Sequence, residues 1–423
     1  MPASDNTKDG KLGSDYDSHV AKQHLEGIPG IVFEEEDEED LRPPCPQPQC
    51  CLLTLLALLL LAIASAVAVY QIVYGQAHPI VDCTTHPYAT VLLLGGRRVS
   101  STTGRPADAV SDVYEYVPTE GRLRRHSLEL PQPLYAVGAT FYDGLLVVSG
   151  GTNGTHIGAV TSVARPDVGF LDRLTAGSPS TYDDDQAHAL VGSRYYVCGG
   201  RSTGRQAGPK CHYYVMAIKV WKHVDRQLLH HVVGAGAAVD AQQRHLYIVG
   251  GGHLAEESEN EIRMATDYVQ RLDTATEKFA AMKRLPRKLN RVGSVMTTSK
   301  NGSETIVACG LARNIRTDRE TKLQDVAASI GCFEYSVTGN SWRPTAVPGK
   351  EALLWPPKLL RCAGRLFAFA PHAERNGTAR VAFERLDEPD DDDDEFGEGK
   401  IWSSISTAIL PTLLVDFRPA CVC

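Results

Sequence analysis

The stretch AVGATFYDGLLVVSGG, residues 136–151, contains the pattern that decides the fold. Two short apolar runs, 136–141 and 145–149, flank Asp143-Gly144, a dipeptide typical of the tight turn in a β-hairpin. The second run ends in Gly150-Gly151, and glycine permits the positive φ of a tight exit from a strand. The stretch therefore predicts two antiparallel strands followed by a sharp turn.

Similar runs recur through residues 85–423, and most of them end in glycine. They cover 91–96, 145–151, 195–200 and 246–251, with two weaker copies at 305–310 and 366–370. Their last residues are 55, 49, 51, 59 and 60 positions apart. Each interval is too short for a domain and suits four strands with their loops, as in one blade of a β-propeller. Further strands are expected after each run, for example at 211–216.

The repeats resemble the kelch repeat, in which an aromatic residue follows the glycine pair and a tryptophan comes seven residues later. Two pairs have this spacing and two are conservative departures: Tyr214 with Trp221, Tyr335 with Trp342, Leu272 with Phe279, and Tyr116 with Leu123. The second unit lacks the pair, and the sixth has Ala370-Pro371 in place of glycines. The resemblance implies an all-β, six-bladed kelch-type propeller over residues 75–423.

The carboxyl terminus is expected to close this propeller. Residues 410–417 (LPTLLVDF) parallel residues 130–137 (LPQPLYAV), which lead into the hairpin quoted above. The first unit has no room for an opening strand before Val91, and an unpaired sheet edge is a liability. We therefore expect the last strand of the chain to complete the first blade.

The eight cysteines that follow residue 51 predict disulfide bonds. Cys198 with Cys211, and Cys309 with Cys332, occupy matching places on neighbouring strands, within disulfide reach. Their spacing fits no zinc-ligand pattern. The predicted closure brings Cys83 near the carboxyl terminus, so we expect it to bond to Cys421 or Cys423, with Cys421 as the assigned partner. The cysteine left over, assigned as Cys423, pairs with Cys362 only if the fold brings the two together, and otherwise could link two chains into a homodimer.

Residues 51–74 form an apolar run of 24 residues without one charge. About 20 apolar residues cross a bilayer, whereas a signal peptide has a shorter core, a basic start and a position at the amino terminus. The sequence thus predicts a transmembrane helix over 51–74, after a disordered tail over 1–50. Cys50 and Cys51, at the membrane edge, are candidates for palmitoylation or are idle thiols.

The glycosylation sequons begin at Asn153, Asn301 and Asn376, all after the apolar run. Together with the even number of cysteines there, they predict a single-pass type II protein of the plasma membrane or a secretory-pathway membrane. The amino terminus is cytoplasmic, and the repeats are extracellular or lumenal.

Charge is divided unevenly along the chain. Residues 1–50 hold four Lys or Arg and twelve Asp or Glu, which equals the net charge of −8, and the remainder balances 39 basic against 39 acidic residues. Nothing here favours nucleic-acid binding. The acidic run 34–40 is a solvated block or a sorting signal. The acidic insertion 387–398 is a solvated loop, a cover for a basic face, or a weak calcium binder.

Propellers bind ligands with the loops before the first and after the second strand of each blade, where kelch domains often carry arginines. Basic residues in such loops are the predicted ligand-binding set: Arg97, Arg98, Arg201, Arg291, His156 and His253. Arginine forks suit carboxylates and phosphates, and the alternative is ordinary solvated loop charge. Asp183, Asp184 and Asp185 lie on a comparable loop and would partly cancel the positive field.

The sequence therefore predicts a membrane-tethered binding protein that recognises an extracellular or lumenal protein or glycan through an anionic group. No catalytic motif, metal site or cofactor is assigned. The alternative is a carbohydrate-active propeller enzyme, such as a copper radical sugar oxidase or a sialic-acid mutarotase-like protein. The sequence does not exclude enzymatic activity.

Overall fold

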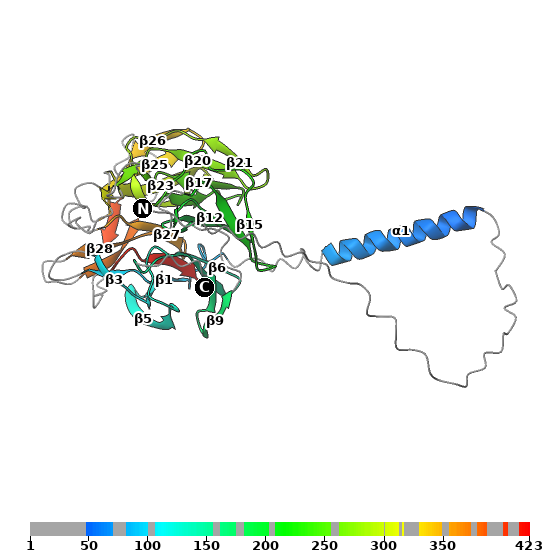
Figure 1. Cartoon of the computed structure of the whole chain (residues 1–423), viewed down its shortest axis with the longest axis horizontal. Coiled ribbons are helices and arrows are strands. Elements are labelled where there is room, and N and C mark those ends of the chain that lie inside the picture. Colours follow the sequence, from blue (N-terminus) through cyan, green and yellow to red (C-terminus); the bar gives the residue numbers. More distant parts are fainter. Residues whose placement is uncertain are drawn as a thin grey trace, which may run out of the picture. The chain divides into compact units, whose positions relative to one another are not determined.

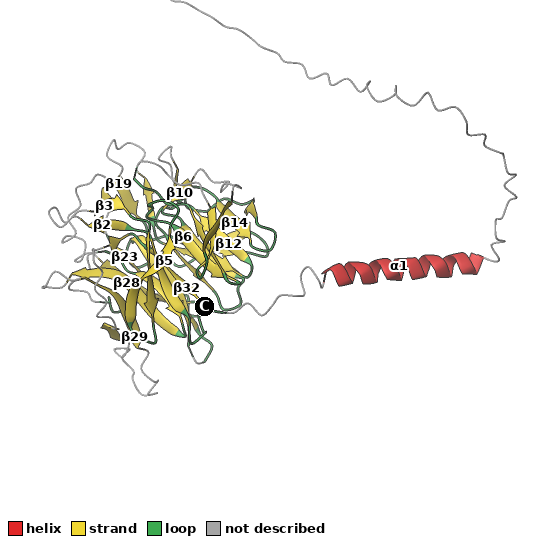
Figure 2. Ribbon diagram, turned by 90° about the horizontal axis from the view of Figure 1, so that it is seen from below, coloured by secondary structure: helices red, strands yellow, loops and turns green. Residues whose placement is uncertain are grey.

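Among the residues that the computed structural model describes, one helix occurs and all other regular elements are strands. The structure describes the following residues: 48–70, 82–99, 106–154, 161–174, 182–202, 208–254, 262–299, 301–312, 315–316, 330–348, 355–373, 379–386, 401–404 and 414–423. The chain divides into two compact units, Met1–Ala77 and His78–Cys423. The strands belong to the second unit (Figures 1 and 2), which confirms the predicted all-β class.

Helix α1 spans Pro48–Tyr70, and its leucines from Leu55 to Leu61 are exposed. In the part of the chain that the structure describes, no helix combines the length and apolar character that a membrane crossing requires. Residues 71–74 of the predicted span and residues 1–47 of the predicted tail lie outside the described residues.

The strands of the second unit form six antiparallel four-stranded sheets among the described residues. The first three, in hydrogen-bonded order, are β32 (Arg418–Val422), β1 (Thr90–Leu94), β4 (Asp112–Val117) and β5 (Arg122–Glu129); β6 (Gly138–Tyr142), β7 (Leu145–Ser149), β8 (Thr161–Arg165) and β9 (Gly169–Leu174); and β11 (Ala187–Val191), β12 (Arg194–Cys198), β14 (Cys211–Val215) and β15 (Val220–His223).

The other three sheets repeat the same order. They are β16 (Gly236–Val239), β17 (His245–Val249), β20 (Val269–Asp273) and β21 (Lys278–Ala281); β22 (Asn290–Thr298), β23 (Glu304–Leu311), β25 (Ile330–Ser336) and β26 (Ser341–Pro344); and β27 (Lys358–Cys362), β28 (Arg365–Ala373), β29 (Ala379–Leu386) and β30 (Ile401–Ser404).

Among the described residues, the hydrophobic core consists of six clusters. Five of them lie between one sheet and the next along the chain, and the sixth lies between the last sheet and the first. Strand β7 shows how one strand serves two clusters. Leu146 and Val148 face the first sheet, while Val147 between them packs with Tyr195 of the third. Because successive side chains of a strand point to opposite faces, a strand buried on both faces is apolar throughout, which explains the continuous runs in the sequence.

The first strands of consecutive sheets are also neighbours. They contact one another in the order β6, β11, β16, β22, β27 and β32, and β32 in turn contacts β6. The approach is close enough to require glycine. A Cβ on Gly293 of β22 would lie 2.3 Å from the carbonyl oxygen of Pro357, directly before β27.

Gly293→Ala is accordingly expected to destabilise the protein by about 1–3 kcal/mol, since backbone atoms must move to admit the methyl group. Thermal unfolding of the full chain in detergent measures the loss. Gly331→Ala is the matched control, because its Cβ would meet side chains and no backbone atom, with Phe333 at 3.3 Å and Leu289 at 3.7 Å. Equal stability of the two variants would contradict close packing at Gly293.

The aromatic pairs of the sequence pattern lie directly opposite each other on the third and fourth strands. Tyr214 faces Trp221, with ring centroids 5.4 Å apart, and Tyr335 faces Trp342 at 4.9 Å. The pairs Leu272 with Phe279 and Tyr116 with Leu123 have the same register. In the sixth sheet Trp402 faces Arg385 instead of Phe383.

The glycine pairs follow the second strands with positive φ, as expected. Gly199 and Gly200 have φ of 68° and 93°, and Gly95 and Gly96 have 59° and 115°. Where the pattern has no such pair, the strand continues. β23 runs to Leu311 and β28 runs to Ala373.

The carboxyl terminus pairs with the first sheet, since β32 lies antiparallel to β1 with Cys421 opposite Val91 (Figure 1). The predicted alignment of 410–417 with 130–137 places Phe417 at the position of Val137, and the strands β32 and β6 begin at the next residue. The segment that pairs with β1 is therefore 418–422, whereas Leu414–Val415 of the preceding apolar stretch pairs with Arg97 and Arg98.

Four disulfide bonds join cysteines of the chain. Cys198 bonds to Cys211 and Cys309 bonds to Cys332, each directly across neighbouring strands, as predicted.

The predicted bond from Cys83 to one of the last two cysteines is confirmed, but its partner is not the one assigned. Cys83 bonds to Cys423 and not to Cys421, which bonds to Cys362. The assigned pairing was wrong because β27, which ends at Cys362, adjoins β32 and brings Cys362 to Cys421. Cys423, one residue beyond the strand, meets the loop that carries Cys83. Since Cys423 is bonded within the chain, its expected role as a free thiol linking two chains was also wrong.

Candidate functional site

One backbone feature repeats at the entrance to the first strand of five sheets, where a residue adopts a positive φ between 51° and 67°. These residues are Ala136, Asp185, Gly234, Arg291 and Asp416. A positive φ is uncommon for residues other than glycine. Because the five positions are equivalent, the repeat brings three charged side chains, Asp185, Arg291 and Asp416, into one layer where the first strands begin.

Asp416 is the centre of a buried ion cluster, with 3% of its side chain exposed. The guanidinium of Arg97 binds Oδ2 through two nitrogens, with Nε at 3.1 Å. Arg291 Nη1 donates to Oδ1 at 2.5 Å, and Trp355 Nε1 donates to the same oxygen at 2.7 Å. Arg291 also lies 4.0 Å from Asp185. The two carboxylates and the three side chains beside them come from five chain segments distant in sequence.

Two aromatic rings cover the arginines of this cluster. Arg97 lies 4.3 Å above the centroid of the Tyr135 ring, and Arg291 lies 4.9 Å from that of Trp355. Burial acts to raise the pKa of Asp416, but the charges of Arg291 and Arg97 outweigh it, so the pKa lies below its ordinary value. Asp416 is therefore ionised at neutral pH.

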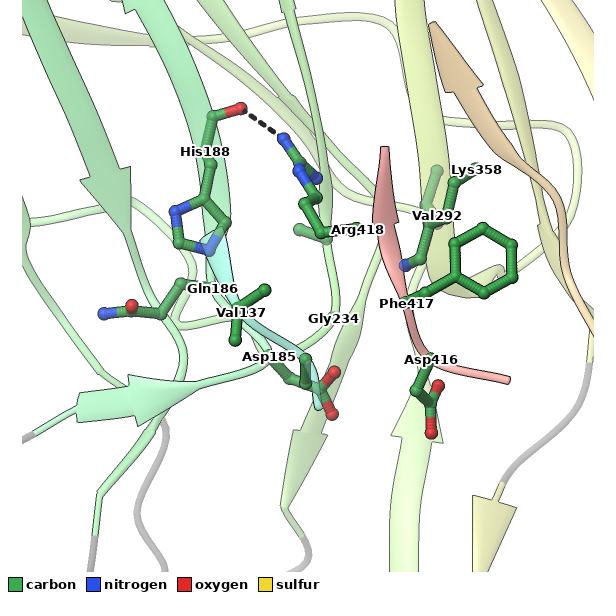
Figure 3. A pocket seen from close by; sticks show the side chains of 12 residues that line it. Val137, Asp185, Gln186, His188, Gly234, Val292, Lys358, Asp416, Phe417 and Arg418 are labelled. Carbon is green, nitrogen blue, oxygen red and sulfur yellow. Dashed lines mark hydrogen bonds between the residues drawn. The ribbon is translucent and has the colours of Figure 1, made fainter. Parts of the chain in front are cut away.

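A cavity of about 30 Å³ lies beside the cluster, enough for a few water molecules at most. Its walls come from the first strands and their entrances: Ala136, Val137, Asp185, Gln186, His188, Gly234, Ala235, Val292, Lys358, Asp416, Phe417 and Arg418. Figure 3 shows Arg418 directed at the backbone carbonyl of His188, while the carboxylates of Asp185 and Asp416 point the other way. Acidic and basic side chains thus line opposite parts of one small space.

His188 belongs to a buried hydrogen-bonded chain behind the cavity wall. Its Nδ1 lies 2.9 Å from the hydroxyl of Tyr195, which lies 3.0 Å from Ser149 Oγ. Burial lowers the pKa of His188 well below its ordinary value, and the charges of Arg418 and Lys358 lower it further. The imidazole is therefore neutral, and burial raises the pKa of Tyr195 to about 12.

The predicted ligand-binding residues fall into two groups. Arg97 and Arg291 come together, as expected for loops around one centre, but both are bound to Asp416. Arg98 is 56% exposed and lies 3.9 Å from Asp112. His253 is exposed on β18 (Gly252–Leu254), and His156 lies outside the described residues.

Three small sheets follow the glycine pairs. Arg201 lies in one of them, His253 in the second, and Arg97 and Arg98 in the third. These sheets are β10 (Tyr182–Asp184) with β13 (Arg201–Ser202); β18 with β19 (Ile262–Ala265) and β24 (Ile315–Arg316); and β3 (Pro106–Ala109) with β2 (Arg97–Val99) and β31 (Leu414–Val415). Figure 2 shows β2, β3, β10 and β19 on one side of the unit. Among the described residues, Arg97, Arg98, Arg201 and His253 therefore lie on strands of these small sheets.

Sequence reasoning missed Asp416, Trp355, Lys358 and Arg418 as site residues. A signal was present for Asp416, because the alignment of 410–417 with 130–137 places it at the entrance of a first strand. Asp185 was expected to offset the positive field, and its position beside Arg291 agrees with that expectation.

Within the described ranges, no group of three His, Cys, Asp or Glu side chains is placed to hold a metal ion. The acidic insertion 387–398 and Asn376 lie outside those ranges. No protein-family model matches the chain, and a search of curated proteins finds no match either.

Proposed function

We propose that the chain is a membrane-tethered binding protein in which a six-bladed kelch-type propeller recognises an anionic group of an extracellular or lumenal protein or glycan. The observation that carries the binding role is the set of three small sheets after the glycine pairs. They fix Arg97, Arg98, Arg201 and His253 on strands at one side of the unit. Side chains fixed before binding lose less conformational entropy when a ligand docks.

The propeller is supported by the six equivalent sheets, by the contacts between their first strands, and by a separate hydrophobic cluster between each sheet and the next. The cluster between the sixth and first sheets includes Phe367 and Tyr116, which lie edge to face with ring centroids 5.7 Å apart. A propeller leaves only short, protected sheet edges, and β32 occupies the edge that β1 would otherwise expose.

The membrane tether is supported by the 24 residues 51–74 without a charge and by the exposed leucines of α1. The type II orientation at the plasma membrane or a secretory-pathway membrane is supported by the four disulfide bonds, which persist in oxidising compartments. Asn153 and Asn301 of two sequons are exposed, as glycan attachment requires.

The test is ligand capture by the full chain in lipid nanodiscs, on arrays of acidic and neutral glycans and in a screen of cell-surface proteins. Arg98→Ala and Arg201→Ala are expected to weaken binding of an anionic ligand at least tenfold each, the loss of about one charge-assisted hydrogen bond. Arg122→Ala, an exposed arginine on β5, is the control and should bind like the wild type. The proposal would be contradicted if Arg98→Ala and Arg201→Ala both captured the ligand as well as the wild type does. Equal capture of acidic and neutral ligands by the wild type would also contradict it.

A further inference from the structure

The cavity beside the ion cluster has two cationic side chains on its wall, Lys358 and Arg418. Neither forms an ion pair with a carboxylate among the residues that the structure describes. Arg418 Nη2 reaches only the backbone oxygen of His188, at a long 3.4 Å, and its Nε is buried without an acceptor. A buried donor without a partner costs free energy, so the Nε–H of Arg418 lacks a compensating acceptor.

The nearby carboxylates are already engaged. Asp416 is held by Arg97, Arg291 and Trp355, and Asp185 lies beside Arg291. The cluster and cavity together contain four cations, Arg97, Arg291, Lys358 and Arg418, against two carboxylates. His188 is neutral and adds no negative charge, and its Nδ1 is occupied by Tyr195. The cluster and cavity together therefore carry an excess of positive charge.

Burial disfavours the charged forms of both Lys358 and Arg418. Burial is the largest cause that lowers the pKa of Lys358, and the charge of Arg418 lowers it further, although Asp185 and Asp416 oppose the shift. Burial lowers the pKa of Arg418 as well. A single negative charge between the two side chains would oppose both effects and would satisfy the buried donor of Arg418.

We propose that this cavity binds a small inorganic anion of about the size of chloride between Lys358 and Arg418. The cavity, of about 30 Å³, accommodates an ion of this size. The basic side chains supply the charge and the hydrogen-bond donors. The site lies on β27 and β32, at the junction of the sixth and first sheets, so the ion stabilises that junction. The inference does not depend on ligand recognition by the small sheets.

The experiment measures thermal unfolding of the full chain in detergent at constant ionic strength, in sodium chloride, sodium bromide or sodium gluconate. Gluconate is too large for the cavity. Because a ligand that binds only the folded state stabilises it, chloride and bromide are expected to raise the melting temperature by about 3–6 °C above gluconate. Lys358→Met and Arg418→Gln should each abolish the difference.

The controls are the same substitutions at exposed positions, Lys278→Met and Arg122→Gln, which should retain the full shift. Equal melting of the wild type in chloride and gluconate would overturn the proposal, as would a shift that persists in both cavity variants. If the variants do not fold, chloride-35 NMR of the wild type decides. Line broadening that bromide displaces supports the site, and its absence overturns it. Ligand capture in nanodiscs is measured in a separate experiment. A failure of the anion site can therefore be told apart from a failure of ligand recognition.

Discussion

Asp416→Asn is expected to lower the free energy of unfolding by about 3–5 kcal/mol, because it removes the charge that holds Arg97 and Arg291 while both guanidinium groups stay buried. Chemical unfolding of the full chain in detergent, followed by tryptophan fluorescence, measures the loss. Asparagine accepts the positive φ of 57° at this position as readily as aspartate does. The substitution therefore tests the ion cluster and not the backbone.

Asp143→Asn is the matched control for Asp416→Asn. Asp143 also has a positive φ, 49°, but it is exposed in the turn between β6 and β7. Its replacement should change stability by less than about 0.5 kcal/mol. Similar effects of the two substitutions would show that the ion cluster contributes nothing to stability.

The ion cluster also predicts an acid dependence. The pKa of Asp416 is lowered in the folded state, so its stabilising contribution is complete above the ordinary pKa of aspartate. The contribution is lost as the pH falls from that value through the lower pKa of the folded state. The wild type should therefore lose stability below about pH 4 more steeply than Asp416→Asn. Parallel curves for the two proteins in this pH range would contradict the assigned pKa shift.

Replacing Cys83 and Cys423 together by serine is expected to cost about 6 kcal/mol, because this bond closes the longest loop of the four disulfides among the described residues. In the chain-entropy model the loss grows with the loop that the bond closes, and these cysteines are 340 residues apart. Melting of the full chain under oxidising conditions, in which the other bonds stay intact, measures the change.

The control for this pair is Cys198→Ser with Cys211→Ser, whose bond closes a separation of only 13 residues. The same model gives about 3 kcal/mol for that loop. A larger loss from the short loop than from the long one would show that strand packing, and not the closure of the chain, sets the contribution of these bonds.

The sequence predicted the strands best where local pattern and burial agree. The second strands are apolar on both faces because each packs on two sheets, and the glycine pairs after them need positive φ. The seven-residue spacing of Tyr214 and Trp221 places them opposite each other across a short turn. Such features depend on a few neighbouring residues, which the sequence contains in full.

The site was predicted only in part, because it depends on contacts between distant segments. Arg97 and Arg291 were recognised from their places beside strand ends, but their partner Asp416 lies 319 residues from Arg97. The bond between Cys362 and Cys421 was not predicted for the same reason, since it requires β27 and β32 to be neighbours. Lys358 and Arg418 are ordinary charges in the sequence and become unusual only through enclosure.

The pairing of β32 with β1 has a consequence for synthesis of the protein. One of the earliest strands to leave the ribosome must wait for the last residues of the chain before its edge is covered. At translation rates of about 5–20 residues per second, the 340 residues between Cys83 and Cys423 correspond to roughly 20–70 s. Until then the nascent chain exposes a bare strand edge and an unpaired thiol at Cys83. Chaperones can hold the chain during this interval, and a message cut short before residue 418 would yield a product that quality control can recognise.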